Sequence, residues 1–251
     1  MIVPGSLKRF LLDTPRCAIL FSGGTDSEIL LRAAADVLDP ENVISLTADS
    51  PFLAGFYRDS IQRVASEIGI ESVFVNVNPM NDPAFIDNTS ERCYICKRKV
   101  YGILKEKARS LGYTAVMDGT NTDDLEECRP GLEAAGECGI LHHVLEAGVG
   151  KADIRRMAVA LSVCGTVIPS DSCLATRIVE GHTITLELVE LVEKMEAPLR
   201  PLVQGKLRVR TDGNMLTVRY SEIDSDVVEK HRQELLDIAE AAGYPCIFHQ
   251  A

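Results

Sequence analysis

The sequence predicts an α/β protein whose parallel sheet is covered by helices on both faces. Up to about residue 170, short runs rich in Val, Ile and Phe alternate with amphipathic helical segments, a pattern that is typical of parallel sheets. Polar, glycine-containing turns follow several of the expected strands. The rhythm then changes to a helix, two alternating strands and another helix, which indicates a small C-terminal α+β domain.

Apolar periodicity and turn residues define the expected elements of the first part. Strands are expected at 17–21, 42–47, 72–77 and 114–117, and helices at 26–38, 53–69 and 93–111. Residues 141–156 are expected to form a strand, a glycine loop and a further helix. The string Pro169-Ser170-Asp171-Ser172 breaks this pattern, so the expected domains are 1–171 and 172–251.

The second part is expected to begin with a helix at 183–196. Strands at 207–210 and 215–219 are joined by Asp212-Gly213-Asn214, and an Asp-Gly turn between alternating strands predicts a hairpin. A helix at 222–242 and a last apolar run at 246–248 complete the domain.

The segment between the first expected strand and helix has the chemistry of an anion-binding loop. It reads Ser-Gly-Gly-Thr-Asp-Ser, and its two glycines let the backbone point successive N–H groups at one spot. The helix N-terminus adds partial positive charge and unpaired donors, and the side chains add hydroxyl groups. The residues predicted to bind a nucleotide here are Ser22, Gly23, Gly24, Thr25, Asp26 and Ser27.

Polar residues also follow two further strands. Ligands of parallel sheets bind at the carboxyl ends of the strands. One nucleotide can therefore touch the glycine loop and the turns that follow these two strands. The predicted contacts are Thr47, Gly119 and Asn121. Asp118 and Asp123 fit either ribose or metal binding or an ordinary turn.

Composition narrows the class of protein. With 46% hydrophobic and 25% charged residues, the chain has the composition of a globular protein. No apolar run reaches the roughly 18 residues of a membrane helix, and the first residues lack the apolar core of a secretion signal. We therefore expect a cytoplasmic protein with no membrane partner. The net charge of -11 disfavours a nucleic-acid partner, because phosphate backbones are bound by clustered Lys and Arg.

Eight cysteines without a secretory signal indicate reduced thiols. Cys93 and Cys96 share one face of an expected helix, so both sulfur atoms can reach one metal centre. By itself this pair fits a redox site, half a zinc site or two packing residues. With Cys173, a zinc site needs a fourth ligand such as His142 or His182, whereas an iron–sulfur cube keeps one iron open. The remaining cysteines are expected to be packing residues: Cys17, Cys128, Cys138, Cys164 and Cys246.

These motifs together resemble a known family. The string SGGTDS is similar to the PP-loop of ATP pyrophosphatases, which transfer AMP, and the alternative phosphate motif G-x-x-x-x-G-K-[ST] is absent. From about residue 10 to 220, the order of motifs resembles that of LarE-type sulfur transferases. In order they are SGGTDS, ERCYICKRKVYGILKEKARSLGY, DGTNTDD followed by RPG, VLEAGVGKADIRRMA, SCLATRI and RVR.

The resemblance implies a PP-loop fold of the adenine nucleotide alpha hydrolase type and ATP-dependent sulfur insertion in nickel-pincer cofactor biosynthesis. A carboxylate of pyridinium-3,5-biscarboxylic acid mononucleotide is adenylated with the help of Mg²⁺, and sulfur then displaces AMP. Some members give up the sulfur of one cysteine, which matches Cys173, and others hold a [4Fe-4S] cluster on three cysteines. Cys93 and Cys96 put this chain with the second group, with Cys173 as third ligand. The implied partners are the nucleotide substrate, a sulfur donor and further copies of the chain in a homo-oligomer.

Four charged residues complete the expected site. Arg208 and Arg210 alternate on one expected strand, where their guanidinium forks suit a phosphate, although the spacing fits a solvated edge strand equally well. Arg177 lies close to Cys173 in the sequence. Glu196 matches an acidic family position near the reactive cysteine. All four are expected to be catalytic, together with Cys173.

Three other functions stay open at this point. Iron–sulfur-dependent tRNA thiolation enzymes also combine a PP-loop with a C-x-x-C pair and a distant cysteine. Ammonia-using synthetases of the same superfamily need no cluster. A nonenzymatic nucleotide-binding module would bind ATP without releasing pyrophosphate.

Overall fold

The computed structural model describes residues 3–126, 130–161, 163 and 173–250. The chain divides into two compact units. The first comprises Met1–Asp49, Tyr57–Val77 and Cys93–Val167, and the second comprises Ser50–Phe56, Asn78–Arg92 and Ile168–Ala251. Two short segments that precede residue 172 therefore belong to the second unit. The assignment of nucleotide binding to 1–171 and of sulfur transfer to 172–251 stays a prediction.

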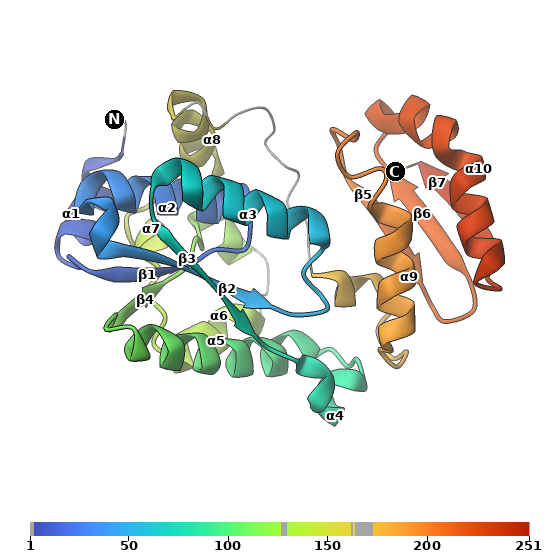
Figure 1. Cartoon of the computed structure of the whole chain (residues 1–251), viewed down its shortest axis with the longest axis horizontal. Helices are drawn as coiled ribbons and strands as arrows, with labels where there is room; N and C mark the ends of the chain where they lie inside the picture. The colour runs from blue at the N-terminus through green and yellow to red at the C-terminus, as the bar shows by residue number, and fades with distance from the viewer. Residues whose placement is uncertain (1–2, 127–129, 162, 164–172, 251) are drawn as a thin grey trace. The chain divides into compact units, whose positions relative to one another are not determined.

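A four-stranded parallel sheet forms the centre of the first unit (Figure 1). The strands are β1 (Cys17–Leu20), β2 (Val43–Asp49), β3 (Glu71–Asn76) and β4 (Ala115–Met117). The helical elements are α1 (Gly5–Leu12), α2 (Thr25–Leu38), η1 (Pro40–Asn42), α3 (Gly55–Ile68), α5 (Arg92–Ser110), η3 (Thr122–Glu126), α6 (Pro130–Glu137), α7 (His143–Glu146) and α8 (Lys151–Ala160). The predicted α/β class with a PP-loop-like parallel sheet is confirmed.

The strand order β3-β2-β1-β4 determines where helices and loops lie. Crossovers between parallel strands are right-handed, so α2 and α3 cover one face of the sheet while α5 covers the other (Figure 1). Cys17 of β1 pairs with Val43 of β2 on one side and with Ala115 of β4 on the other. The direction of winding reverses between β1 and β4, and ligands of such sheets bind at this switch point.

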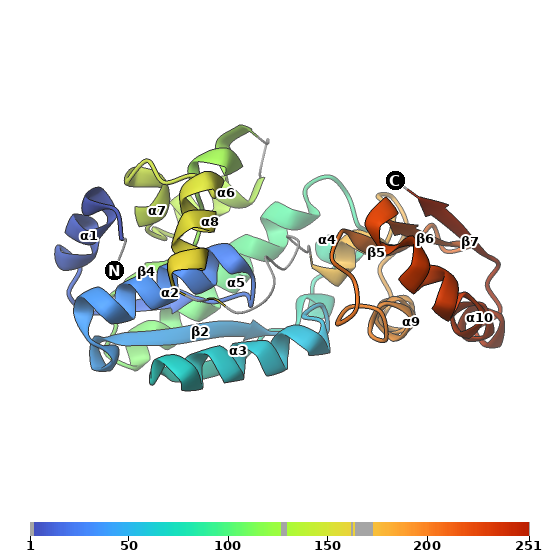
Figure 2. The same cartoon turned by 90° about the horizontal axis from the view of Figure 1, so that it is seen from above.

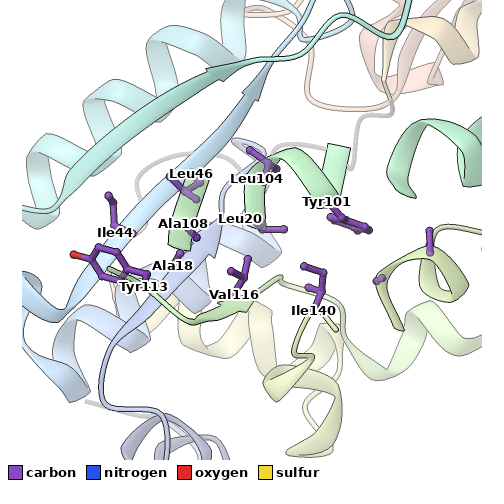
Figure 3. Packing of buried hydrophobic residues seen from close by; sticks show 12 residues of the cluster. Ala18, Leu20, Ile44, Leu46, Tyr101, Leu104, Ala108, Tyr113, Val116 and Ile140 are labelled. Carbon is purple, nitrogen blue, oxygen red and sulfur yellow. The ribbon is translucent and has the colours of Figure 1, made fainter. Parts of the chain in front are cut away.

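The core on the α5 face is shown in Figure 3. Tyr101, Leu104 and Ala108 recur at helical spacing and form the buried stripe of α5. They pack against β1, β2, β4 and α6, and the buried cluster includes Ala18, Leu20, Ile44, Leu46, Val116, Ala134, Ala135 and Ile140. Burial of this apolar surface fixes α5, and with it the C-x-x-C pair in its first turns, against the sheet.

On the opposite face of the sheet, helices α1 and α8 cover α2. Figure 2 shows α8 lying against α2. Leu30, Leu31 and Ala34 of α2 are completely buried. The helix that follows the candidate phosphate loop is therefore fixed on several sides.

The strand expected at the start of segment 141–156 is wrong. Leu141 forms only an isolated parallel bridge with Met117, and the next residues form the short helix α7. The His143 ring stacks on Phe10 at 5.3 Å between centroids, and its Nε2 lies 3.0 Å from the Thr14 hydroxyl. These contacts with α1 and its following turn favour a compact turn over an extended strand.

The second unit contains a three-stranded sheet and two long helices. Its elements are η2 (Pro79–Asn81), α4 (Pro83–Ile86), η4 (Leu174–Arg177), α9 (Leu186–Glu196), β5 (Leu207–Thr211), β6 (Leu216–Tyr220), η5 (Glu222–Asp224), α10 (Ser225–Ala241) and β7 (Cys246–Gln250). β5 and β6 are antiparallel and β7 is parallel to β6. Alternate residues of β5 and β6 are buried, while α9 packs on β5 and α10 packs on β6 and β7. The small C-terminal α+β part is thus present.

Among the described residues, no helix is long and apolar enough to cross a membrane.

Candidate functional site

The loop between β1 and α2 has the geometry expected of an anion-binding turn. Gly23 has φ of +81°, and a Cβ at this position would lie 3.0 Å from Cδ1 of Tyr57, so only glycine fits. The Ser27 hydroxyl donates to the Gly24 carbonyl at 2.9 Å and lies 3.2 Å from the Ser22 hydroxyl. Gly24 is extended and begins α2. The Gly24 N–H donates to the Ser22 hydroxyl oxygen at 3.5 Å. Among the described residues, the N–H groups of Thr25, Asp26 and Ser27 have no helical carbonyl before them and can donate to a ligand.

The loop after β4 packs directly on this helix N-terminus. A Cβ at Gly119 would lie only 2.7 Å from the backbone nitrogen of Ser27 and 2.9 Å from the carbonyl carbon of Asp26. The close approach requires glycine. The structure therefore brings together the predicted residues of these two loops at the switch point of the sheet.

Asp26 is held by two partners from the other side of the site. Lys151 donates from Nζ to Asp26 Oδ2 at 3.0 Å, and the Asn121 amide donates to the same oxygen at 3.2 Å. Asp123 accepts the backbone N–H of Lys151 at 2.8 Å. A Cβ at Gly150 would lie 2.6 Å from the Asp123 carboxylate. The two loops and the start of α8 thus form one connected polar network.

Lys151 is a residue that the sequence reasoning missed as a site residue. It is the first residue of α8, and a cation at a helix N-terminus is electrostatically unfavourable unless an anion is close. A lysine directly after a glycine loop, at the start of a helix, was the available signal. In the structure Asp26 is that anion.

Thr47 and Asn121 are buried and stabilise the loops from within. Thr47 is 2% exposed, and its hydroxyl donates to the Phe21 carbonyl at 2.7 Å. Asn121 has no exposed surface, and its side-chain oxygen accepts the Asp123 N–H at 3.1 Å. Both predicted residues lie at the site, where their hydrogen bonds hold the loop backbone.

Asp118 forms a second polar group at the end of β4. Its carboxylate lies 2.8 Å from Nδ1 of His142 and 3.3 Å from the Tyr101 hydroxyl. Burial raises the pKa of Asp118, but hydrogen bonds from His142 and Thr120 outweigh burial and lower this pKa below its usual value. The same hydrogen bond raises the pKa of His142. Because an ionised carboxylate only accepts hydrogen bonds, His142 donates from Nδ1.

The three cysteines of the expected cluster are divided between the units. Cys93 and Cys96 lie half-buried in the first turns of α5, and Cys173 is exposed in the second unit. Within either unit, the described residues contain no group of three or more His, Cys, Asp or Glu side chains that could hold a metal ion. The two α5 thiols share a helix face and suit one metal centre. The three-cysteine site stays a prediction.

The other described cysteines have packing environments. Cys17 is completely buried, and burial raises the pKa of its thiol to about 12. Cys138 packs at the edge of the α5 core cluster, and burial also raises the pKa of the half-buried Cys246. Cys128 and Cys164 lie outside the described residues.

Glu196 forms the centre of a buried ion-pair network in the second unit. Arg177 donates from Nε and Nη2 to its two carboxylate oxygens at 2.7 and 3.2 Å, and Arg200 also donates to it. The Val209 N–H donates to the same carboxylate at 2.6 Å. Arg177 and Glu196 have no exposed surface. Here Glu196 positions Arg177 and ties α9 to β5.

Arg208 and Arg210 lie on the face of β5 opposite the buried one. Nε of Arg210 is buried and has no hydrogen-bond partner among the described residues. Desolvation, followed by the charges of Arg208, Arg219 and Arg177, lowers the pKa of the Arg210 guanidinium. An anion bound on this face would supply the missing partner.

The parallel sheet and its flanking helices define an α/β protein whose fold is PP-loop-like. No family model matches the chain. An uncharacterized protein of Synechocystis sp. is 33% identical over 241 residues, which cover 95% of this chain and 90% of that protein. An uncharacterized protein of Methanocaldococcus jannaschii is 28% identical over 226 residues, which cover 90% and 85%.

A third relative has a named activity. The pyridinium-3,5-bisthiocarboxylic acid mononucleotide synthase of Lactiplantibacillus plantarum is 30% identical over 212 residues, which cover 84% of this chain and 77% of the synthase. The chain belongs to the family of this synthase, the LarE family.

Proposed function

We propose that the chain is an ATP-dependent sulfur transferase of nickel-pincer cofactor biosynthesis. Its substrate is pyridinium-3,5-biscarboxylic acid mononucleotide, and its product carries a thiocarboxylate in place of a carboxylate. The name of the Lactiplantibacillus plantarum relative, a bisthiocarboxylic acid mononucleotide synthase, supports this substrate class. The observation that carries the proposal is the network of Asp26, Lys151 and Asn121 around the glycine loop at the switch point of the sheet.

The first step is adenylation of the substrate carboxylate. A carboxylate oxygen attacks the α-phosphorus of ATP, the bond from this phosphorus to the bridging oxygen of the β-phosphate breaks, and pyrophosphate leaves. The N–H groups of the first turn of α2 bind the negative charge that develops on pyrophosphate. Lys151, held 3.0 Å from Asp26, is a cation within the same loop network. Mg²⁺ bound to the triphosphate would supply further charge neutralisation, and Asp26 is the carboxylate present to hold it.

The second step transfers sulfur. A sulfur nucleophile attacks the acyl carbon, AMP leaves with the bonding electron pair, and a thiocarboxylate remains. In the cluster-dependent form of this reaction, a [4Fe-4S] cluster would be held by Cys93, Cys96 and Cys173. It would supply an iron that binds sulfide. Arg208 and Arg210 bind the phosphate of the mononucleotide during both steps. Arg177, fixed by Glu196, is a positioning residue beside the segment of Cys173.

Pyrophosphate release tests the first step. With ATP, Mg²⁺ and pyridinium-3,5-biscarboxylic acid mononucleotide, the wild type is expected to release pyrophosphate in a substrate-dependent manner. Lys151→Ala is expected to lower kcat about 100-fold, the scale of losing one charge-stabilising donor. Lys8→Ala, which removes an exposed lysine of α1, is the control and is expected to retain full activity. ATP binding without pyrophosphate release would contradict the proposal and favour a nonenzymatic nucleotide-binding module.

Anaerobic purification tests the source of sulfur. The cluster-dependent form of the reaction predicts a brown protein with a broad visible absorption band. This band is expected to be lost in Cys93→Ala, Cys96→Ala and Cys173→Ala. Cys246→Ala, in a half-buried packing position, is expected to keep the colour. A colourless wild type whose mass falls by one H₂S after turnover would instead establish Cys173 as a sacrificial sulfur donor.

A further inference from the structure

Asp118 and His142 form a carboxylate–imidazole pair at the end of β4. Asp118 is the first residue after the strand, and His142 lies directly before α7. A contact of 2.8 Å joins Asp118 Oδ1 to His142 Nδ1. The Asp118 N–H donates to the Leu141 carbonyl at 3.2 Å, and the Thr120 N–H donates to Asp118 Oδ1 at 3.1 Å. These backbone bonds fix the geometry of the pair.

The second ring nitrogen of His142 is available for chemistry. Because Nδ1 donates its proton to Asp118, Nε2 of the neutral ring carries a lone pair. Nothing in the described part of the chain hydrogen-bonds to Nε2, and the His142 side chain is 16% exposed. The arrangement suits a general base with an orienting carboxylate, since Asp118 fixes the tautomer and stabilises the imidazolium that forms when Nε2 takes up a proton.

The charged groups around His142 favour proton uptake. The hydrogen bond to Asp118 is the largest cause that raises the pKa of His142, and the charges of Asp118 and Glu146 add to it. Burial and the charge of Lys97 oppose this shift. These groups come from the end of β4, from α7 and from α5. The two carboxylates therefore make His142 more basic than a free imidazole.

Tyr101 connects the pair to the helix that carries the C-x-x-C cysteines. Its hydroxyl donates to Asp118 Oδ2 at 3.3 Å and accepts from Lys97 Nζ at 3.2 Å. Burial, followed by the charge of Asp118, raises the pKa of Tyr101, so the phenol keeps its proton and remains a donor. The charge of Cys96 also contributes to this shift. The Cys96 thiol and the carboxylate that orients His142 thus both lie around Tyr101.

The pair also borders the candidate nucleotide site. Gly119 follows Asp118 directly and packs on backbone atoms of Asp26 and Ser27 at the start of α2. The phosphate loop, the pair and the C-x-x-C cysteines all belong to the first unit. A carboxylate activated at the phosphate loop and a sulfur nucleophile held at the cysteines would therefore both be close to His142.

The sulfur step of the proposed reaction needs a group that accepts one proton. When hydrosulfide attacks the acyl carbon, a C–S bond forms, the bond from this carbon to the AMP oxygen breaks, and AMP leaves with the bonding electron pair. The S–H proton must also leave, because the product is a thiocarboxylate anion. Adenylation needs no such base, because the attacking carboxylate carries no proton.

We propose that His142 is the general base of the sulfur step: its Nε2 takes the S–H proton, while Asp118 orients the ring and stabilises the imidazolium. The inference rests on the proposed function and deepens it, because it assigns the second step a residue that the first step does not use. Loss of the base is expected to slow sulfur transfer about 100-fold, a usual scale of general base catalysis, and to leave adenylation intact.

His142→Asn separates the base from the hydrogen bond, because an amide can still donate to Asp118 but takes up no proton. The full chain is given ATP, Mg²⁺, pyridinium-3,5-biscarboxylic acid mononucleotide and sodium sulfide. The variant is expected to release pyrophosphate in the first turnover as fast as the wild type, to accumulate adenylated substrate in mass spectra, and to form thiocarboxylate about 100-fold more slowly. His249→Asn, the same change at an exposed position of β7, is the matched control and is expected to behave as the wild type.

The pH profile distinguishes a base from a merely structural residue. At a constant concentration of hydrosulfide, the wild-type rate of thiocarboxylate formation is expected to rise with pH through the pKa of His142 and then to level off, because only the neutral ring accepts a proton. Asp118→Asn removes the charge that raises this pKa, so the rise is expected at lower pH. His142→Asn is expected to show no such rise. NMR titration of the histidine rings without substrate measures the same pKa and its decrease in Asp118→Asn.

The outcomes separate this role from the proposed function. Equal rates of thiocarboxylate formation in the wild type and His142→Asn, zero included, would overturn the role of His142 while pyrophosphate release upholds adenylation. Loss of pyrophosphate release in a His142→Asn chain that circular dichroism shows to be folded would also overturn it, since the residue would then support the nucleotide site. A wild type that releases no pyrophosphate would instead contradict the proposed function itself.

Discussion

Gly119 is the residue at which the two loops of the candidate nucleotide site touch. A methyl group here would collide with backbone atoms of Asp26 and Ser27 at 2.9 and 2.7 Å, and backbone cannot move aside as a flexible side chain does. We expect Gly119→Ala to cost about 1–3 kcal/mol of unfolding free energy and to weaken ATP binding, because the start of α2 must shift. Urea unfolding and calorimetric titration with ATP measure the two effects.

Gly102 gives the matched control. It is exposed on α5 and a Cβ there would meet nothing within 4 Å. Gly102→Ala is expected to add about 0.5–1 kcal/mol of stability by restricting the unfolded chain. An unchanged ATP affinity in Gly119→Ala would show that the loop contact does not shape the site.

The pair of Asp118 and His142 predicts a pH dependence of stability. The pKa of His142 is raised from 6.5, so its contribution is fully present below pH 6.5 and is lost as pH rises through the raised value. The pKa of Asp118 is lowered from 3.8, so its contribution is present above pH 3.8 and is lost as pH falls through the lowered value. The pair of Asp118 and His142 therefore stabilises the folded protein most between pH 3.8 and pH 6.5.

Urea midpoints from pH 5.5 to pH 8.5 measure this contribution. Relative to His142→Gln, the wild type is expected to lose stability as pH rises through this range. His182→Gln, at an exposed position of the second unit, is expected to follow the wild-type profile. Parallel profiles for wild type and His142→Gln would contradict the prediction.

Residue chemistry explains which site residues could be predicted. Glycine turns and hydroxyl-rich strings are local, so the loop from Ser22 to Ser27 was visible in the sequence. Lys151 acts through Asp26, a partner 125 positions away, and such a pair is set by tertiary packing. The missing acceptor of Arg210 Nε likewise depends on the burial of an atom, which strand alternation does not give.

At the scale of elements, Glu196 joins helix α9, the turn η4 and strand β5. Its buried carboxylate accepts from Arg177, Arg200 and the Val209 N–H. Glu196→Gln removes the charge that compensates two largely buried guanidinium groups, and such losses cost about 3–5 kcal/mol. We expect this loss in urea unfolding, together with weaker binding of the mononucleotide, because β5 carries Arg208 and Arg210.

Glu190→Gln tests whether the loss is specific. Glu190 is an exposed residue of the same helix, and surface changes of this kind stay within about 0.5 kcal/mol. Similar stability of Glu196→Gln and Glu190→Gln would refute the role of Glu196 as the link between α9 and β5.

Elements with a clear apolar period were predicted well. The expected helix at 93–111 corresponds to α5 at Arg92–Ser110, and the expected hairpin corresponds to β5 and β6. The strand expected at the start of segment 141–156 is wrong, because a run of apolar and histidine residues fits either structure. Contacts of His143 with Phe10 and Thr14 favour a helical turn. The short helices α1, α4 and α6 lack a long period and were not predicted.

At the scale of the whole molecule, the net charge of -11 favours the proposed reaction over tRNA thiolation. We expect no tRNA binding at physiological salt, because an acidic surface repels the phosphate backbone. A filter-binding assay with total tRNA measures this, and a tRNA-thiolating enzyme of the same superfamily serves as the positive control. Saturable binding at physiological salt would favour the thiolation alternative.

The two units could be predicted only in outline. The alternation of expected strands and helices ends near residue 170, and this change marks the later part of the second unit. Nothing in the sequence indicates that Asn78–Arg92 belongs with it. Asn88 explains why it does. Its buried amide donates to the carbonyls of Ile178, Val179 and His182, which are pairings across about 90 positions that only the folded chain creates.

This interleaving has a practical consequence for recombinant work. A gene truncated to begin at residue 173 would encode the three-stranded sheet without Asn88, so the carbonyls at 178, 179 and 182 would lose their donor in the isolated fragment. Phe85, which is 1% exposed in the intact chain, would be missing as well. A stand-alone version of the second unit therefore requires residues 50–56 and 78–92 to be fused ahead of the later segment through flexible linkers. Crystallisation or NMR of the β5 face that carries Arg208 and Arg210 should start from that design.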